Sequence, residues 1–235
     1  MDGGPHPSMA TDGWVVAIDA ADGAGADMAL TTSGEYDITG VMLLFELATA
    51  IAGEILGIHP FNQPDVEIAK RLAASAMAGE LADSARPPIA IDDDTLARVL
   101  GSILTGHRPS YVSIQAYLAP STSTDAALES LRELIDTHCG VYTTVGYGPR
   151  FLHSTGQIHK GGPPGGVFLQ ILDDPQATLH VPETDFTFNE LISAQAAGDR
   201  AALTDRGRSV VSVELGRDTD SGLSLLIDAV RTALQ

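Results

Sequence analysis

Short apolar stretches alternate with amphipathic stretches along residues 111–234, and this order constrains the fold more than any other feature. Residues 111–118, 141–146, 166–172 and 209–215 are strand-like, and 123–138, 188–198 and 221–234 have the apolar spacing of helices. The first six of these elements match a split β-α-β arrangement, an antiparallel sheet with helices on one face. We therefore predict an α/β protein whose C-terminal part, residues 91–235, is such an α+β domain.

Residues 1–90 predict a smaller unit. A strand is expected over 14–20, an apolar helix over 37–55, and a second helix from Pro64 to about Met77. The polar, proline-bearing stretch 79–93 predicts a linker, so we place a domain boundary near residue 90. Glu46 and Glu54 interrupt the apolar run 41–58, which favours a buried helix over a membrane span.

The connection between the second and third predicted strands, residues 147–165, is too long for a hairpin turn. It lies in the segment GYGPRFLHSTGQIHKGGPPGG, and residues 137–172 contain no acid although the formal net charge of the chain is −18. Arg150 and Lys160 supply positive charge, and Ser154, Thr155 and glycine backbone N–H groups are donors. The loop is therefore either a plain structural connection or a site for a compact anion such as a phosphate ester.

Other chemistry at this loop is less favoured. His153 and His159 have no nearby cysteine or acid that would complete a set of metal ligands, so no metal is expected. Cys139 is next to His138, and such a pair could form a thiol nucleophile with its base. A cysteine at the end of a helix more often packs against neighbouring side chains, and we favour that interpretation. A pI near 4.4 argues against nucleic acid and anionic membranes as partners. A single cysteine excludes an internal disulfide and fits a cytoplasmic location.

Two segments resemble the phosphoglucose isomerase family. The first is LFELATAIAGEILGIHPFNQPDVEIAK (44–70), and the second is GYGPRFLHSTGQIHKGGPPGGVFLQI (146–171). The second is similar to the C-terminal region of the isomerase half of bacterial bifunctional transaldolase/glucose-6-phosphate isomerases, as is FTFNELISAQAAGD (186–199). The resemblance implies that residues 1–90 are the end of a truncated sugar-isomerase domain. It also implies interconversion of glucose 6-phosphate and fructose 6-phosphate without metal or organic cofactor.

The family chemistry opens the sugar ring and then moves a proton between C1 and C2 through a cis-enediol. The resemblance assigns catalytic roles to His153, which exchanges protons as histidine can near neutral pH, and to Lys70 by the ring oxygen. It places Gln157 and Gln63 near the sugar. Local chemistry adds four candidate substrate-binding residues: Arg150, Lys160, Ser154 and Thr155. Each has a plainer interpretation, for example a solvated helix lysine for Lys70.

The family's phosphate loop and enediol glutamate lie N-terminal of these motifs, and the stretch MALTTSGEYD (28–37) matches neither. Two hypotheses follow. The chain contributes part of an isomerase site, or it is a non-catalytic module that binds a sugar phosphate or assists assembly. Besides the sugar phosphate, the expected partner is an N-terminal isomerase or transaldolase polypeptide, or a second copy of the chain.

Overall fold

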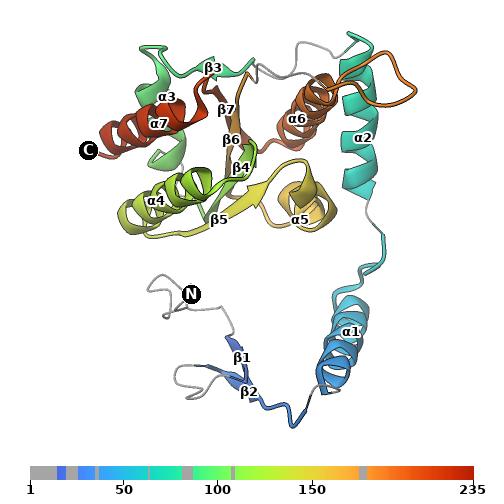
Figure 1. The fold of residues 1–235 in the computed structure, drawn as a ribbon. Coiled ribbons are helices and arrows are strands. Elements are labelled where there is room, and N and C mark those ends of the chain that lie inside the picture. Colours follow the sequence, from blue (N-terminus) through green and yellow to red (C-terminus); the bar gives the residue numbers. More distant parts are fainter. Residues whose placement is uncertain are drawn as a thin grey trace. The chain divides into compact units, whose positions relative to one another are not determined.

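The structure is a computed structural model that describes residues 15–19, 26–34, 37–62, 64–80, 87–106, 109–174 and 179–235. The chain divides into two compact units, Met1–Gln63 and Pro64–Gln235. In the first unit, the strands β1 (Val16–Ile18) and β2 (Met28–Leu30) pair in parallel and are followed by the helix α1 (Asp37–Leu56) (Figure 1).

The helix α1 is not buried, so that prediction from the sequence is wrong. Gly53 is its buried residue, and Ile55 is 78% exposed. Within the described part of the chain, α1 is long and apolar enough to cross a membrane, with a mean hydropathy of 1.7. Length and composition alone support this, and core helices of other proteins meet the same test.

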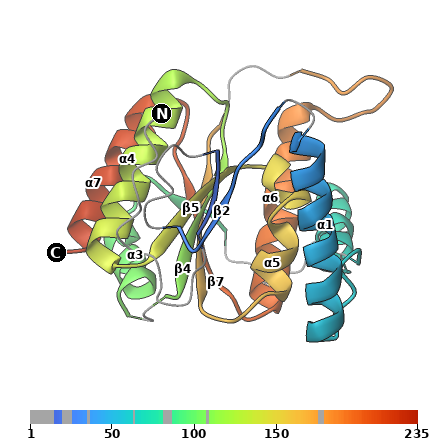
Figure 2. The same cartoon turned by 90° about the horizontal axis from the view of Figure 1, so that it is seen from below.

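The second unit is built on a five-stranded sheet in the order β3-β7-β6-β4-β5, in which every strand pair is parallel. The strands are β3 (Ile89–Ala90), β4 (Tyr111–Tyr117), β5 (Tyr142–Tyr147), β6 (Gly166–Leu172) and β7 (Ser209–Glu214). Helices cover both faces of this sheet (Figure 2). The α/β class is confirmed, whereas the antiparallel split β-α-β arrangement with helices on one face is wrong.

The parallel pairing explains the long connection after β5. Strands β5 and β6 both pair with β4, which lies between them, so residues 148–165 must cross over β4. Parallel neighbours need a crossover of a dozen or more residues, and a hairpin turn cannot make it. The crossover contains the 3₁₀ helix η1 (Arg150–His153) and the helix α5 (Gly156–Gly161).

The two faces of the sheet differ in chemistry. Toward α3 (Leu96–Leu104), α4 (Thr122–Cys139) and α7 (Thr219–Ala233) the strands present residues such as Ile114, Leu169 and Val213, all fully buried in one apolar core. Toward α5 and α6 (Phe188–Asp205) the alternate positions include several polar residues besides aromatic ones such as Phe168. Ser113, Gln115, Gln170 and Ser212 are at most 4% exposed.

Local signals fix the helices that border these faces. The Ser121 side chain accepts a hydrogen bond from the backbone of Thr124 at the start of α4, and Gly140 ends that helix in the left-handed conformation, with φ of 63°. Thr187 and Glu190 form a capping box at the start of α6. At the other edge of the sheet, β3 pairs only with Val213 and Glu214, and Pro87 and Pro88 precede it.

The helix α2 (Pro64–Met77) belongs to the second unit, where it packs against α6. The first compact unit therefore ends, and the second begins, between residues 63 and 64, whereas the polar stretch 79–93 predicts a boundary near residue 90. The names given to those two parts, the end of a sugar-isomerase domain and a C-terminal domain, stay predictions.

Candidate functional site

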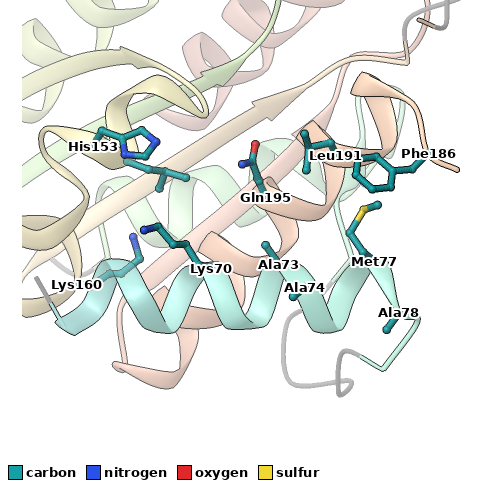
Figure 3. A pocket seen from close by; sticks show the side chains of 11 residues that line it. Lys70, Ala73, Ala74, Met77, Ala78, His153, Lys160, Phe186, Leu191 and Gln195 are labelled. Carbon is teal, nitrogen blue, oxygen red and sulfur yellow. The ribbon is translucent and has the colours of Figure 1, made fainter. Parts of the chain in front are cut away.

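The crossover η1–α5 and the helices α2 and α6 surround a cavity of about 580 Å³ within the second unit. In Figure 3, Lys70, His153 and Lys160 lie at one end of it, and Met77 and Phe186 lie at the other. The cavity therefore has a basic end and an apolar end. Its lining residues are Lys70, Ala73, Ala74, Met77, Ala78, Leu152, His153, Lys160, Phe186, Leu191 and Gln195.

His153 is the last residue of η1, and its side chain is exposed at the cavity. The turn that carries it is held by hydrogen bonds from Leu152 N to Pro149 O and from Ser154 N to Phe151 O, both 3.0 Å long. Phe151 is buried and packs edge to face on Tyr117, with ring centroids 5.8 Å apart. A buried aromatic anchor thus fixes the backbone under an imidazole that solvent and ligand can reach.

Lys70 reaches the same cavity from α2. Its ammonium forms an ion pair with Glu67 one turn earlier, with 2.7 Å between Nζ and Oε1, and both side chains are more than half exposed. Exposed pairs of this kind contribute about 0–1 kcal/mol, so Lys70 can leave Glu67 for an anionic ligand at little cost. The packing of α2 on α6 sets the position of the Lys70 backbone.

Lys160 is in a different state, because its side chain is 1% exposed and forms an ion pair with Asp199 of α6. Its Nζ also donates to Gly156 O at 3.3 Å. The positive charge of Lys160 is therefore already balanced inside the protein. This favours a role in joining α5 to α6 over the direct phosphate contact expected from the sequence.

The other predicted residues that the structure describes are not among the lining residues of this cavity. Ser154 and Thr155 are exposed, and their hydroxyls donate to Phe151 O within the turn, at 3.1 and 3.5 Å. Arg150 is exposed and lies 5.9 Å from the centroid of the Tyr147 ring. Gln157 is half-buried in α5. Gln63 lies outside the described residues.

A buried histidine of α5 was considered from the sequence only as a metal ligand. His159 is 5% exposed, and its Nδ1 and Nε2 lie 3.4 Å from Gln115 Nε2 and 3.5 Å from Ser113 Oγ. An amide nitrogen can only donate, so Nδ1 accepts and the ring proton sits on Nε2. Burial, with a smaller effect of the neighbouring Lys160, lowers the pKa of His159 from 6.5 to about 4.

Two further residues came only with the structure. Gln195 of α6 lines the cavity, and Asp199 lies one turn farther along the same helix. Both fall in or next to the segment 186–199 that carries part of the family resemblance. No spacing rule pairs an acid in one helix with a lysine in another, so the Lys160–Asp199 pair had no signal of its own.

The fold and the cavity define a parallel α/β domain with a partly basic, partly apolar pocket beside one helix layer. No protein-family model matches the chain. A stretch of 55 residues is 38% identical to a probable glucose-6-phosphate isomerase of Methanococcus maripaludis. That stretch is 23% of this chain and 13% of the relative, so the similarity to an isomerase is partial.

Among solved structures, the chain resembles a hypothetical protein of Thermus thermophilus, TT0462, with a TM-score of 0.53 and 17% sequence identity. The likeness covers 74% of this chain and 44% of that one. At this identity the comparison shows the fold alone. The matches cover 13% of the first of these proteins and 44% of the second, so each spans less than half of the protein that it matches.

Proposed function

We propose that the cavity beside α2 and α6 binds a sugar phosphate and contributes His153 and Lys70 to the interconversion of glucose 6-phosphate and fructose 6-phosphate. One observation carries the proposal. Lys70 and His153 come from two separate isomerase-like segments of the sequence, and they line the same cavity. The partial similarity to a probable glucose-6-phosphate isomerase supports the same reaction.

The basic end of the cavity suits the polar part of such a substrate. At this end of the cavity, Lys70 forms only an exposed, weak ion pair with Glu67, so its ammonium can bind an anionic or strongly polar oxygen of the ligand. His153 can give a proton to the ring oxygen while the C1 hydroxyl loses one to a base, which breaks the bond between C1 and the ring oxygen and leaves an open-chain aldehyde. The later proton transfer from C2 to C1 needs a second base.

A carboxylate is the family's base for that second step, and none is among the described residues that line the cavity. This observation favours a second candidate function, a module that binds sugar phosphate without turning it over. Within the first proposal, the base comes from a partner, either an N-terminal isomerase or transaldolase polypeptide or a second copy of this chain.

A coupled assay tests the first candidate. Fructose 6-phosphate is converted by the full chain, alone and mixed with the partner polypeptide, and the glucose 6-phosphate formed is oxidised by an NADP-dependent dehydrogenase. We expect His153→Ala to lower kcat by about 10²–10⁴-fold, the usual contribution of general acid–base catalysis. His138→Ala is the matched control, because His138 is exposed on α4 and does not line the cavity.

Lys70 has an equally close control in Arg71, the next residue of α2, which is exposed and does not line the cavity. Lys70→Ala should weaken turnover or binding at least tenfold, and Arg71→Ala should not. Calorimetry with fructose 6-phosphate separates the candidates, since binding without turnover in every mixture supports the second one. If the chain neither binds nor converts the sugar phosphate, both candidates are refuted.

A further inference from the structure

A second hollow, of about 810 Å³, lies at the opposite edge of the sheet, between α3, β7 and the end of α6. Its lining includes three arginines, Arg98, Arg200 and Arg208, in a chain with 13 lysines and arginines against 31 acids. None of its lining residues also lines the cavity beside α2. It is therefore a separate site, and its chemistry does not depend on the proposed isomerase function.

The strongest observation concerns buried charge. Lys160, Asp199 and Arg200 are each at most 9% exposed, and they bring two positive charges and one negative charge into the interior. Asp199 is ion-paired with Lys160, whereas Arg200 forms no ion pair with any described carboxylate. A buried charge without a counter-ion is costly, so this arrangement lacks one negative charge.

The guanidinium of Arg200 is only partly satisfied. Its Nη1 donates to Gln170 Oε1 at 3.1 Å and to Ser212 Oγ at 3.4 Å, while its Nε is buried and donates to no described group. Burial lowers the pKa of Arg200, and the nearby carboxylate of Asp199 offsets only part of that effect. An anion in the adjoining hollow would offset that effect.

The guanidinium of Arg208, like that of Arg200, has a buried Nε that donates no hydrogen bond to a described group. Its two terminal nitrogens donate to the backbone oxygens of Lys160, Gly162 and Pro163 at 2.5–3.0 Å. Arg98 is exposed on α3 at the rim and forms no ion pair with a described residue. Among the described lining residues the acid is Asp93, which is exposed, accepts a hydrogen bond from the backbone N–H of Thr95 at 2.8 Å and is attracted to Arg98.

Arg200 also borders a neighbouring hollow of about 530 Å³, whose lining includes the acids Asp173, Asp174, Glu190 and Glu214. Glu190 is held by the capping box of α6, and Asp173 accepts a hydrogen bond from Thr219. The carboxylates of this neighbouring hollow repel anions, so an anion would be attracted to the hollow lined by the three arginines instead.

We propose that the hollow lined by Arg98, Arg200 and Arg208 binds the phosphate group of a small phosphorylated molecule. The planar guanidinium matches the geometry of phosphate oxygens, and a doubly charged group would supply the missing negative charge. The ligand must be compact, because a protein with a formal net charge of −18 repels long polyanions. Arg208 also holds the end of α5, so the bound phosphate would sit next to the helix that carries Lys160.

The test measures binding of inorganic phosphate to the full chain by calorimetry, with glycerol 1-phosphate as a second probe that shows whether an ester group adds affinity. Arg98→Glu should weaken binding about tenfold or more, since hydrogen bonds between charged groups are worth more than one factor of ten. Arg217→Glu is the control, because it makes the same charge change at an arginine that is 73% exposed and outside the hollow.

A second measurement does not depend on Arg98. Phosphate should raise the melting temperature of the native chain, and Arg200→Met should abolish that rise, while Gln170 and Ser212 keep their own hydrogen bond of 2.8 Å. The proposal is overturned if the native chain fails to bind millimolar phosphate, if Arg98→Glu and Arg217→Glu bind it equally, or if Arg200→Met still responds to it.

Discussion

The buried imidazole of His159 makes the stability of the second unit depend on pH. In the folded protein its pKa is lowered to about 4 by burial and by Lys160, while in the unfolded chain it has the ordinary value of 6.5. Below pH 6.5 the unfolded chain therefore gains a proton that the folded protein does not. The stabilisation is complete above pH 6.5 and is lost as the pH falls toward 4.

The size of the effect follows from those two values. A difference of one pKa unit corresponds to 1.36 kcal/mol, so a lowering from 6.5 to about 4 is worth about 3 kcal/mol. Between pH 6 and pH 4.5 the free energy of unfolding should change by about 1.2 kcal/mol per pH unit through this group alone. Most of the loss thus occurs above the pH range in which ordinary carboxylates titrate.

Urea unfolding of the full chain, followed by far-UV circular dichroism at pH 7, 6, 5 and 4.5, measures this change. His159→Asn keeps a polar group near Gln115 and Ser113 but cannot take up the proton, so its pH slope should be smaller by that amount. Carboxylates with lowered pKa values, such as those of Asp93 and Glu190, act equally in both proteins and cancel. His138→Asn, which changes an exposed histidine, should keep the native slope.

The reasoning is refuted if the native protein and His159→Asn lose stability in parallel between pH 7 and 4.5. It is also refuted if His138→Asn alone flattens the slope.

Two further changes test the packing around the crossover. Asp199→Ala leaves the Lys160 ammonium buried without its partner, so it should lower the free energy of unfolding by about 3–5 kcal/mol. The double variant Lys160→Met/Asp199→Leu removes both charges and should recover most of that stability. A loss under about 1 kcal/mol in Asp199→Ala would contradict the buried pair. Gly148→Ala would place a Cβ 2.6 Å from the Tyr117 ring, so it should lower the free energy of unfolding in urea by about 1–3 kcal/mol. If the loss is equal in the native and Tyr117→Leu backgrounds, the ring is not its cause.

The strands of the second unit were predictable because each is a short apolar segment between turn residues. The predicted strand 166–172 has the same bounds as β6, and 111–118 and 209–215 each differ from their strands by one residue. Their pairing was not predictable by the same pattern. Ser113, Gln115 and Gln170 alternate with apolar residues, which is typical of a sheet with one face in water.

Those polar side chains are instead buried and bonded to groups brought by α5 and α6. Gln170 receives a hydrogen bond from Arg200, and Gln115 reaches His159. Period-two patterns cannot distinguish a polar residue in water from one that meets a partner distant in the sequence. The helix α5 (Gly156–Gly161) was not predicted for a different reason, because its six residues include two glycines and no apolar repeat.

The candidate site was predictable to the extent that its residues sit in recognisable segments. His153 and Lys70 were chosen from two motifs, and both line one cavity. The state of Lys160 could not be read from its motif, because it is decided by Asp199 in another helix. The arginine hollow had no motif at all, because Arg98 and Arg208 come from separate segments that only the sheet edge brings together.

The short strand β3 also affects how the protein behaves when crowded. It pairs only with Val213 and Glu214 of β7, so among the described residues, 209–212 have no strand partner on that side. Such an edge is a surface on which foreign chains can add a strand and begin to aggregate. Pro87 and Pro88 stand in front of β3 and have no N–H to donate to a neighbouring strand. The two prolines therefore oppose the addition of a strand from another molecule at this sheet edge, even at high protein concentration.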